Sequence, residues 1–477
     1  MRNHKTLIAA PLAVLLGSAL TAGCGGSSGG SDNDDGSATI GDAVLFGATD
    51  GTTGVELWKT DGTADGTSLV RDINPAGDSD PFNFVVLDGI AFFTADNGAG
   101  EEVWRSDATQ SGTRMLKDIN PAGSSDPSDL AVSQGRLYYR ANDTVTGFEP
   151  WVSDGTSAGT EQLKDISPGG SNSNGRFAGE AGGMTILAAS SPGAGYELWK
   201  TDGTEEGTEL IKDINPDGGA YLQNFGEFDG ELYFGAEDGS TGNELWKTDG
   251  TEAGTTLVAD LVDGATGSFP NGGREFAAVG DVLFFTADTD GDPDNDDVAL
   301  WKTDGTEAGT TLVAEINAGG NDRVRGLTAY DGRLVFEADD GTNGSELWIS
   351  DGTEAGTTMV KNIFAAGGSS FPAIAGLTEY GGELYFTAQD AGVLNYEVWK
   401  TDGTEAGTVQ VADIGAGVTG SGPGNYRPIA DGVLFTADDG VTGCELWRTN
   451  AAGDDASQVR DINEGADDGF PGACDID

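Results

Sequence analysis

The densest group of possible metal ligands lies at residues 288–297, where the chain reads Asp-Thr-Asp-Gly-Asp-Pro-Asp-Asn-Asp-Asp. Carboxylates this close in sequence repel one another unless a cation lies between them, and alternating oxygen ligands suit Ca²⁺. The run lacks the glycine at the sixth place and the final glutamate of an EF-hand loop. A solvated acidic loop is the alternative interpretation. The predicted calcium ligands are Asp288, Asp290, Asp292, Asp294 and Asp296.

Cleavage of a glycosidic bond is a second chemistry open to this chain, because it requires only two carboxylates about 5 to 9.5 Å apart. The single histidine is His4, in the N-terminal segment. A Ser-His-Asp triad and the usual His/Cys zinc sites are therefore excluded for the rest of the chain. Acidic residues are too abundant for their presence alone to indicate an enzyme. The candidate carboxylates are Glu149, Glu180, Glu227, Glu275 and Glu337.

The charge balance restricts the class of partner. The 477 residues include 80 Asp or Glu and 24 Lys or Arg, which gives a formal net charge of −56. Binding to nucleic acid requires clustered Lys and Arg that displace counterions from the phosphates, so we expect no nucleic-acid partner. The expected partners are a protein or a polysaccharide at the cell surface, and the chain is predicted to be a monomer.

The N-terminus predicts export and a lipid anchor. Arg2 and Lys5 precede an apolar run over residues 7–20, which is typical of a signal peptide and too short to span a bilayer comfortably. The small residues before Cys24 resemble a bacterial lipobox, although Thr21 stands where that motif most often has Leu. We predict a signal peptide over 1–23, lipidation of Cys24, and a Gly/Ser/Asp-rich tether over 24–36. In the lipoproteins that this segment resembles, the absence of an acidic residue after the cysteine favours the outer membrane or cell surface. Contact with the membrane is expected through the lipid alone.

The remaining chain is a repeat array. The motif Glu-Leu-Trp-Lys-Thr-Asp-Gly-Thr-x-x-Gly-Thr occurs at 56–67, 197–208 and 244–255, and close variants of it recur along the chain. Ala299 replaces the glutamate in the sixth repeat, and Asn450 replaces the aspartate in the ninth. The motif resembles the ELWxxDGT repeat family of bacterial exported proteins, and this resemblance implies a β-propeller-like array without established catalytic residues. Every tryptophan lies in the motif, at Trp58, Trp104, Trp151, Trp199, Trp246, Trp301, Trp348, Trp399 and Trp447.

One repeat of about 47 residues contains four short apolar segments separated by turn residues, which is typical of a propeller blade. A two-residue turn such as Asp88-Gly89 closes the first pair of strands. We predict an all-β fold over 37–477, a closed ring of about nine four-stranded antiparallel blades, with eight to ten allowed by the spacing. Each Trp is expected to pack between blades, and the Asp of each Asp-Gly-Thr is expected to cap a turn, with metal binding there as the alternative.

Two further features concern the closure of the ring and the second strand of each repeat. Cys444 and Cys474 are predicted to form a disulfide where the C-terminal tail packs beside the first blade, with two free buried thiols as the alternative. Arg140 and Glu337 stand where the other seven repeats have Gly, Thr or Ala. Arg140 and Glu337 could line a functional site, but a local ion pair is the favoured interpretation.

Two functional hypotheses follow. The first is a non-enzymatic, surface-anchored lipoprotein that acts as a binding or scaffold module for protein or polysaccharide, with Ca²⁺ as its only expected cofactor. The alternative is a glycan-active propeller enzyme, a glycosidase or lyase, that uses paired carboxylates.

Overall fold

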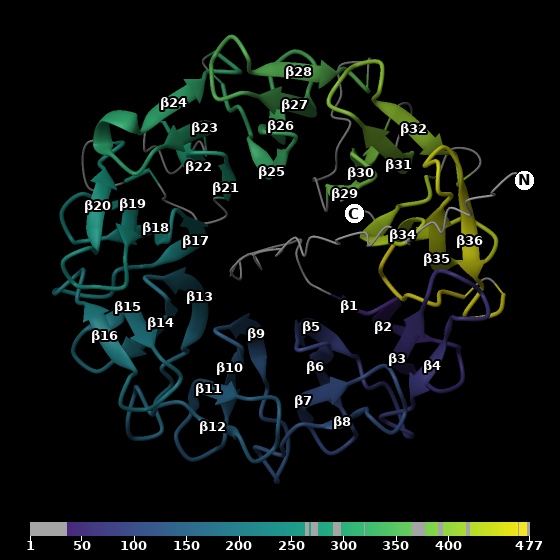
Figure 1. The fold of residues 1–477 in the computed structure, drawn as a ribbon, viewed down its shortest axis with the longest axis horizontal. Coiled ribbons are helices and arrows are strands. Elements are labelled where there is room, and N and C mark those ends of the chain that lie inside the picture. Colours follow the sequence, from purple (N-terminus) through teal and green to yellow (C-terminus); the bar gives the residue numbers. More distant parts are fainter. Residues whose placement is uncertain are drawn as a thin grey trace, which may run out of the picture.

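The chain folds into a ring of nine four-stranded sheets (Figure 1). The computed structural model describes residues 36–262, 267–268, 275–289, 297–318, 320–364, 377–389, 395–415, 420–465 and 467–474. The helical structure in these ranges is one 3-10 turn, η1 (Glu307–Gly309). The structure therefore confirms an all-β propeller and sets the number of blades at nine.

Each blade is a run of four consecutive strands that pair antiparallel in chain order. Blades 1 to 3 contain β1 (Ser37–Ile40), β2 (Ala43–Thr49), β3 (Val55–Thr60), β4 (Ser68–Arg71); β5 (Phe82–Leu87), β6 (Ile90–Asp96), β7 (Glu101–Ser106), β8 (Arg114–Met115); and β9 (Ser128–Ser133), β10 (Arg136–Asn142), β11 (Phe148–Ser153), β12 (Thr160–Gln162). Blades 4 to 6 contain β13 (Arg176–Ala181), β14 (Met184–Ser191), β15 (Gly195–Thr201), β16 (Glu209–Lys212); β17 (Gln223–Phe228), β18 (Glu231–Glu237), β19 (Asn243–Thr248), β20 (Thr256–Ala259); and β21 (Phe276–Val279), β22 (Val282–Asp288), β23 (Val298–Thr303), β24 (Thr311–Ala314). Blades 7 to 9 contain β25 (Arg325–Tyr330), β26 (Arg333–Asp339), β27 (Ser345–Ser350), β28 (Thr358–Lys361); β29 (Thr378–Tyr380), β30 (Glu383–Gln389), β31 (Tyr396–Thr401), β32 (Val409–Ala412); and β33 (Gly424–Ile429), β34 (Gly432–Asp438), β35 (Cys444–Thr449), β36 (Ala456–Arg460).

The first strand of each blade lies at the central opening and the fourth at the outer rim (Figure 1). The second strand is buried on both faces, as the consecutive buried residues Val44, Leu45 and Phe46 show. Successive side chains in a strand point to opposite faces, so each blade is covered on both sides by its neighbours. The turns between first and second strands are tight. Asp88 and Gly89 have φ angles of 50° and 73°, the positive values that a two-residue hairpin turn requires.

Hydrophobic cores lie between the blades rather than within them. Nine apolar clusters correspond to the nine blade interfaces. Between blades 1 and 2, Leu45 and Leu57 pack against Phe93 and Trp104. Each motif tryptophan lies in, or packs against, the apolar cluster between its own blade and the preceding blade. The tryptophan spacing is therefore the spacing of blade interfaces, because each interface takes one indole.

The ring closes between blades 9 and 1, at a seam that the C-terminal tail covers. Phe470 packs against Phe46 with ring centroids 5.3 Å apart, and the Thr49 N–H donates to the Gly469 carbonyl at 2.9 Å. A disulfide joins Cys444 at the start of β35 to Cys474 in the tail, with Cα atoms 5.7 Å apart. The tail is thus bonded to blade 9 while its phenylalanine packs on blade 1.

A cation on the fourth strand, or two residues after its end, connects most blades to the next one. The Lys212 ammonium donates to the Thr255 carbonyl of blade 5 at 2.7 Å and lies 5.5 Å from the Trp246 ring centroid. Three blades have alanine at this register, so the contact is absent from three interfaces. The cations that bridge blades in this way are Arg71, Lys117, Lys164, Lys212, Lys361 and Arg460.

Replacing Lys212 with methionine should lower the free energy of unfolding by about 1 kcal/mol, because the change removes one hydrogen bond and one partly exposed cation–π contact. Thermal denaturation followed by circular dichroism measures the effect. Lys247→Met is the matched control, since the Lys247 ammonium pairs with Glu231 of its own blade at 2.8 Å. A loss no larger than that of the control would show that the bridging cation does not stabilise the interface.

Candidate functional site

The antiparallel order of the strands gives the propeller two distinct faces. The turns between first and second strands and the loops between third and fourth strands lie on one face, which we call the turn face. In blade 1 these are the turn at Gly41-Asp42 and the loop at 61–67. The loops between second and third strands and the connections to the next blade lie on the other, the crossover face.

The Asp-Gly-Thr aspartates cap loops on the turn face. Asp61 accepts hydrogen bonds from the Thr63 N–H at 2.9 Å and from the Thr63 hydroxyl at 2.6 Å, which lower the pKa of its carboxyl. A Cβ on Gly66 would lie 2.0 Å from Asp61 Oδ1, so the loop requires glycine there. Eight loops share this hydrogen bond from the threonine hydroxyl to Asp61, Asp107, Asp154, Asp202, Asp249, Asp304, Asp351 and Asp402.

The glutamate of the motif is buried and structural. The Glu56 carboxylate is fully buried and accepts from the Ile73 N–H at 2.6 Å, the Asn74 N–H at 3.2 Å and the Ser79 hydroxyl at 2.7 Å. It therefore connects the third strand to the segment that crosses to the next blade, and burial raises its pKa. Buried carboxylates in this position are Glu56, Glu102, Glu149, Glu197, Glu244, Glu346, Glu397 and Glu445. Glu149, a candidate for catalysis, belongs to this set.

Blade 6 has Ala299 at the position of this glutamate, and its carboxylate comes from the crossover segment instead. Asp322 accepts from the Ile316 N–H at 3.1 Å and the Asn317 N–H at 2.5 Å, and burial raises its pKa to about 6. Asp322 lies 23 residues after Ala299, the same separation as from Glu56 to Ser79. Sequence reasoning noted Ala299 but missed this exchange. The signal in the sequence was an aspartate at the position that corresponds to Ser79, in the one repeat that lacks the motif glutamate.

Three other candidate glutamates join the inner strands of neighbouring blades. Glu227 Oε1 accepts the backbone N–H of Glu180 at 2.7 Å, and Glu180 accepts from the Ser133 hydroxyl and the Gln134 side-chain amide, each at 2.7 Å. Glu275 accepts the N–H of Leu327 in blade 7 at 2.7 Å. Burial, with a smaller effect of the nearby Glu180 charge, raises the pKa of Glu227. The structure brings Glu180 and Glu227 together, while the other candidates lie elsewhere in the ring.

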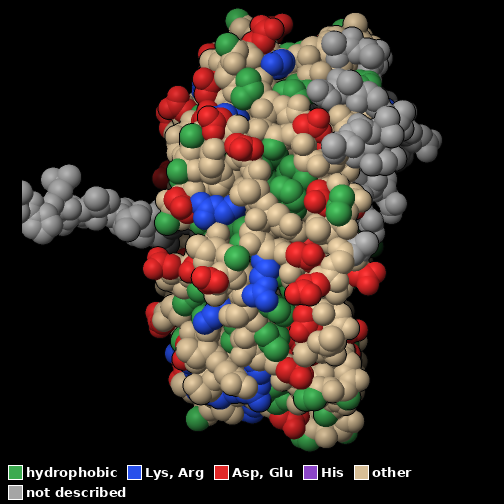
Figure 2. Space-filling view, turned by 90° about the vertical axis from the view of Figure 1, so that its right-hand side faces the viewer, with side chains coloured by type: hydrophobic (Ala, Val, Ile, Leu, Met, Phe, Trp, Pro, Cys, Tyr) green, Lys and Arg blue, Asp and Glu red, His purple; other side chains and the backbone are tan. Residues whose placement is uncertain are grey.

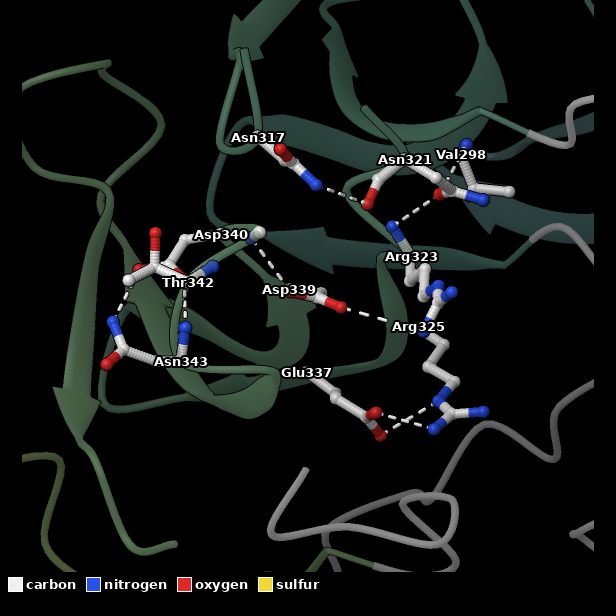
Figure 3. A network of polar contacts seen from close by, with 11 residues as sticks. Val298, Asn317, Asn321, Arg323, Arg325, Glu337, Asp339, Asp340, Thr342 and Asn343 are labelled. Carbon is white, nitrogen blue, oxygen red and sulfur yellow. Dashed lines mark hydrogen bonds and ion pairs between the residues drawn. The ribbon is translucent and has the colours of Figure 1, made fainter. Parts of the chain in front are cut away.

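Arg140 and Glu337 lie in different blades, and each has a local partner. Arg325 donates to both carboxylate oxygens of Glu337, at 2.8 and 2.5 Å, and the Glu337 side chain is fully buried (Figure 3). Arg140 Nε lies 3.7 Å from the Asp129 carboxylate and donates to Ser128 Oγ at 3.0 Å. The two departures from the small-residue pattern are therefore separate ion pairs.

Most of the predicted calcium loop lies outside the described residues, as do the signal peptide, Cys24 and the tether up to residue 35. Asp290, Asp292, Asp294 and Asp296 belong to that undescribed part. Asp288 is buried at the end of β22, and its N–H donates to the Ser268 carbonyl at 2.9 Å. Within the described ranges, no three His, Cys, Asp or Glu side chains converge as a metal site.

Two shallow grooves open on the turn face at equivalent places in blades 1 and 6. The blade 1 groove has a volume of about 490 Å³ and the blade 6 groove about 320 Å³. Lys59, Asp61, Ser68 and Ala43 are among the residues that line the first groove. The corresponding residues of the second groove are Lys302, Asp304, Thr311 and Val282.

No family model and no curated protein matches the chain. Similar solved structures include a puromycin hydrolase (14% identity, TM-score 0.37, 72% of this chain and 54% of that one) and a prolyl endopeptidase (13%, 0.40, 77% and 54%). An acylaminoacyl peptidase of Pyrococcus horikoshii is a third (12%, 0.38, 80% and 52%). The chain spans about half the length of each. Likenesses this weak carry no argument about activity.

On the side of the ring that Figure 2 shows, acidic side chains lie toward both edges of the rim, and Lys or Arg side chains lie between them. In the described part of the chain, no helix has the length and apolar character needed to cross a membrane.

Proposed function

We propose that this chain is a non-enzymatic binding or scaffold module, anchored at the bacterial outer membrane or cell surface by a lipid on Cys24, that engages a protein or a polysaccharide. The observation that carries the proposal is the use of its recurrent carboxylates. The aspartates of the turn face cap loops and the buried glutamates bind crossover segments. These carboxylates are engaged in holding loops and crossover segments in place.

Glycan cleavage remains the second candidate, because one observation favours it. Glu180 and Glu227 lie on adjacent inner strands, and burial raises the pKa of Glu227, as a general acid requires. Both carboxylates accept hydrogen bonds from the protein, and the two grooves lie in other blades. The binding function is therefore the better supported of the two.

The test compares the full chain with Cys24→Ser in a bacterial host with an outer membrane. We expect the full chain to sediment with membranes and to incorporate labelled palmitate, and the variant to remain in the soluble exported fraction. Immobilised Cys24→Ser protein should then retain an envelope protein or a polysaccharide without releasing reducing ends from the polysaccharide. Release of reducing ends that Glu227→Gln abolishes would instead establish the enzyme.

Calcium at residues 288–297 stays a proposal from the sequence, and the same preparation tests it. Melting temperature and retention are measured with Ca²⁺ and with a chelator. The calcium proposal fails if the chelator leaves both quantities unchanged.

A further inference from the structure

The two grooves of the turn face share one design. In each, a lysine of the third strand lies beside the capping aspartate of the Asp-Gly-Thr loop, and a hydroxyl residue begins the fourth strand. Lys59, Asp61 and Ser68 form this set in blade 1. The same chain positions supply Lys302, Asp304 and Thr311 in blade 6. Recurrence at one repeat position, in two blades far apart in sequence, indicates a feature of the repeat rather than an accident of one loop.

The residue at one position decides whether the lysine at the groove is paired with a carboxylate of its own blade. The first residue of the second strand is Ala43 in blade 1 and Val282 in blade 6. In blade 5 the same position holds Glu231, whose carboxylate pairs with Lys247 at 2.8 Å. In blade 8 it holds Glu383, which pairs with Lys400 at 2.8 Å. A glutamate at this position therefore reaches the lysine that borders the groove, whereas alanine or valine leaves that lysine accessible.

The two groove lysines retain donors for a ligand. Lys59 Nζ donates to the Ala108 carbonyl of blade 2 at 3.0 Å, and Lys302 Nζ donates to the Gly352 carbonyl of blade 7 at 2.7 Å. An ammonium group has three N–H donors, so each lysine is positioned by one bond and has others to offer. Asp61 is exposed and has a second carboxylate oxygen beyond the one that accepts from Thr63.

This combination of groups suits a ligand rich in hydroxyls. A sugar ring offers hydroxyls that donate to a carboxylate and accept from an ammonium or a hydroxyl. A peptide anchor would instead fill a deep apolar or aromatic pocket, and the lining residues of these open grooves include no aromatic side chain. The net charge of −56 disfavours a polyanionic ligand. On the basis of the proposed binding function, we propose that the two turn-face grooves bind sugar units of a neutral polysaccharide.

The placement of the grooves adds a second property. Blade 1 (β1–β4) and blade 6 (β21–β24) lie on opposite sides of the ring (Figure 1), and both grooves open on the same face. One long polymer can therefore occupy both sites, which converts the second binding event into an intramolecular one. A short oligosaccharide reaches a single site. The polymer should bind about 10- to 100-fold more tightly than a fragment of four to six sugar units.

The test uses full-length protein in detergent and native gels cast with dextran, starch, mannan or a soluble β-glucan, with alginate as the acidic comparison. Ala43→Glu and Val282→Glu copy the closed arrangement of blades 5 and 8. We expect at least one neutral polysaccharide to retard the wild type. Each single variant should lose about tenfold in affinity, and the double variant should lose retardation.

Ala64→Glu is the matched control, because it adds the same charge to an exposed position of the blade 1 loop that does not line the groove. Its retardation should equal that of the wild type. If the double variant does not fold, as judged by its circular dichroism and melting temperature, Lys59→Met combined with Lys302→Met takes its place.

Three outcomes overturn the inference. They are retardation that survives closure of both grooves, retardation by none of the neutral polysaccharides, and loss of a protein partner instead of a polysaccharide when the grooves are closed. In the first and third outcomes a ligand is still bound, so the proposed function survives while the groove assignment fails. In the second outcome, the proposed function survives if the same preparation retains an envelope protein, and it fails if no envelope protein is retained.

Discussion

Replacing Asp322 with alanine should lower the free energy of unfolding by about 2–4 kcal/mol, the cost of leaving buried N–H donors without their charged acceptor. The Ile316 and Asn317 N–H groups both donate to this carboxylate. Blade 6 has Ala299 where other blades place the motif glutamate, so no side chain of that strand can substitute. Urea denaturation and the melting temperature measure the loss.

The repeat itself supplies the control. Combining Ala299→Glu with Asp322→Ser recreates the arrangement around Glu56, where a glutamate accepts and a serine donates. This double variant should recover most of the stability that Asp322→Ala loses. Ala299→Glu alone should be destabilising, because it places two carboxylates in one buried site. If Asp322→Ala melts with the wild type, the carboxylate does not support the crossover segment.

The propeller should be most stable near pH 5 and lose at least about 2 kcal/mol of stability between pH 5 and pH 8. Burial raises the pKa of Glu197, Glu244 and Glu445 to about 7. The folded state therefore holds protons that the unfolded chain has released above about pH 4.5. This contribution is fully present below that pH and is lost as the pH rises through 7.

The capping aspartates act in the opposite direction at lower pH. Hydrogen bonds from threonine lower the pKa of carboxyls such as Asp61 and Asp249. Their contribution is present above the ordinary aspartate pKa of 3.8 and is lost as the pH falls through the lowered value. The buried glutamates and the capping aspartates together place the maximum of stability between the pH ranges in which the two sets of carboxyls titrate.

Melting temperatures at pH 4, 5, 6, 7 and 8, at constant ionic strength, test this profile. Glu244→Gln should flatten the decline between pH 5 and 8, since the amide cannot ionise. Asp249→Asn should leave that decline unchanged. A melting temperature that rises steadily from pH 5 to pH 8 would refute the assignment of raised pKa values to the buried glutamates.

The regular features of this protein could be predicted because they repeat. One tryptophan per interface makes the tryptophan spacing a count of blades, as Trp104 between blades 1 and 2 illustrates. Positive φ angles at Asp88 and Gly89 follow from a hairpin turn of two residues. The turn follows from the residues of a single repeat, whereas the blade count follows from comparing successive repeats.

Which group each carboxylate and each groove lysine contacts was decided by the tertiary structure, which brings different strands and blades together. Glu227 binds the backbone of a neighbouring blade 47 residues away, and Asp322 takes over the function of a residue missing from another strand. Glu231 pairs with Lys247 of the adjacent strand, whereas Ala43 at the same position of blade 1 has no side chain that could reach Lys59. The repeat period therefore specifies the ring, whereas the contacts of individual carboxylates and lysines depend on which residues meet across strands and blades.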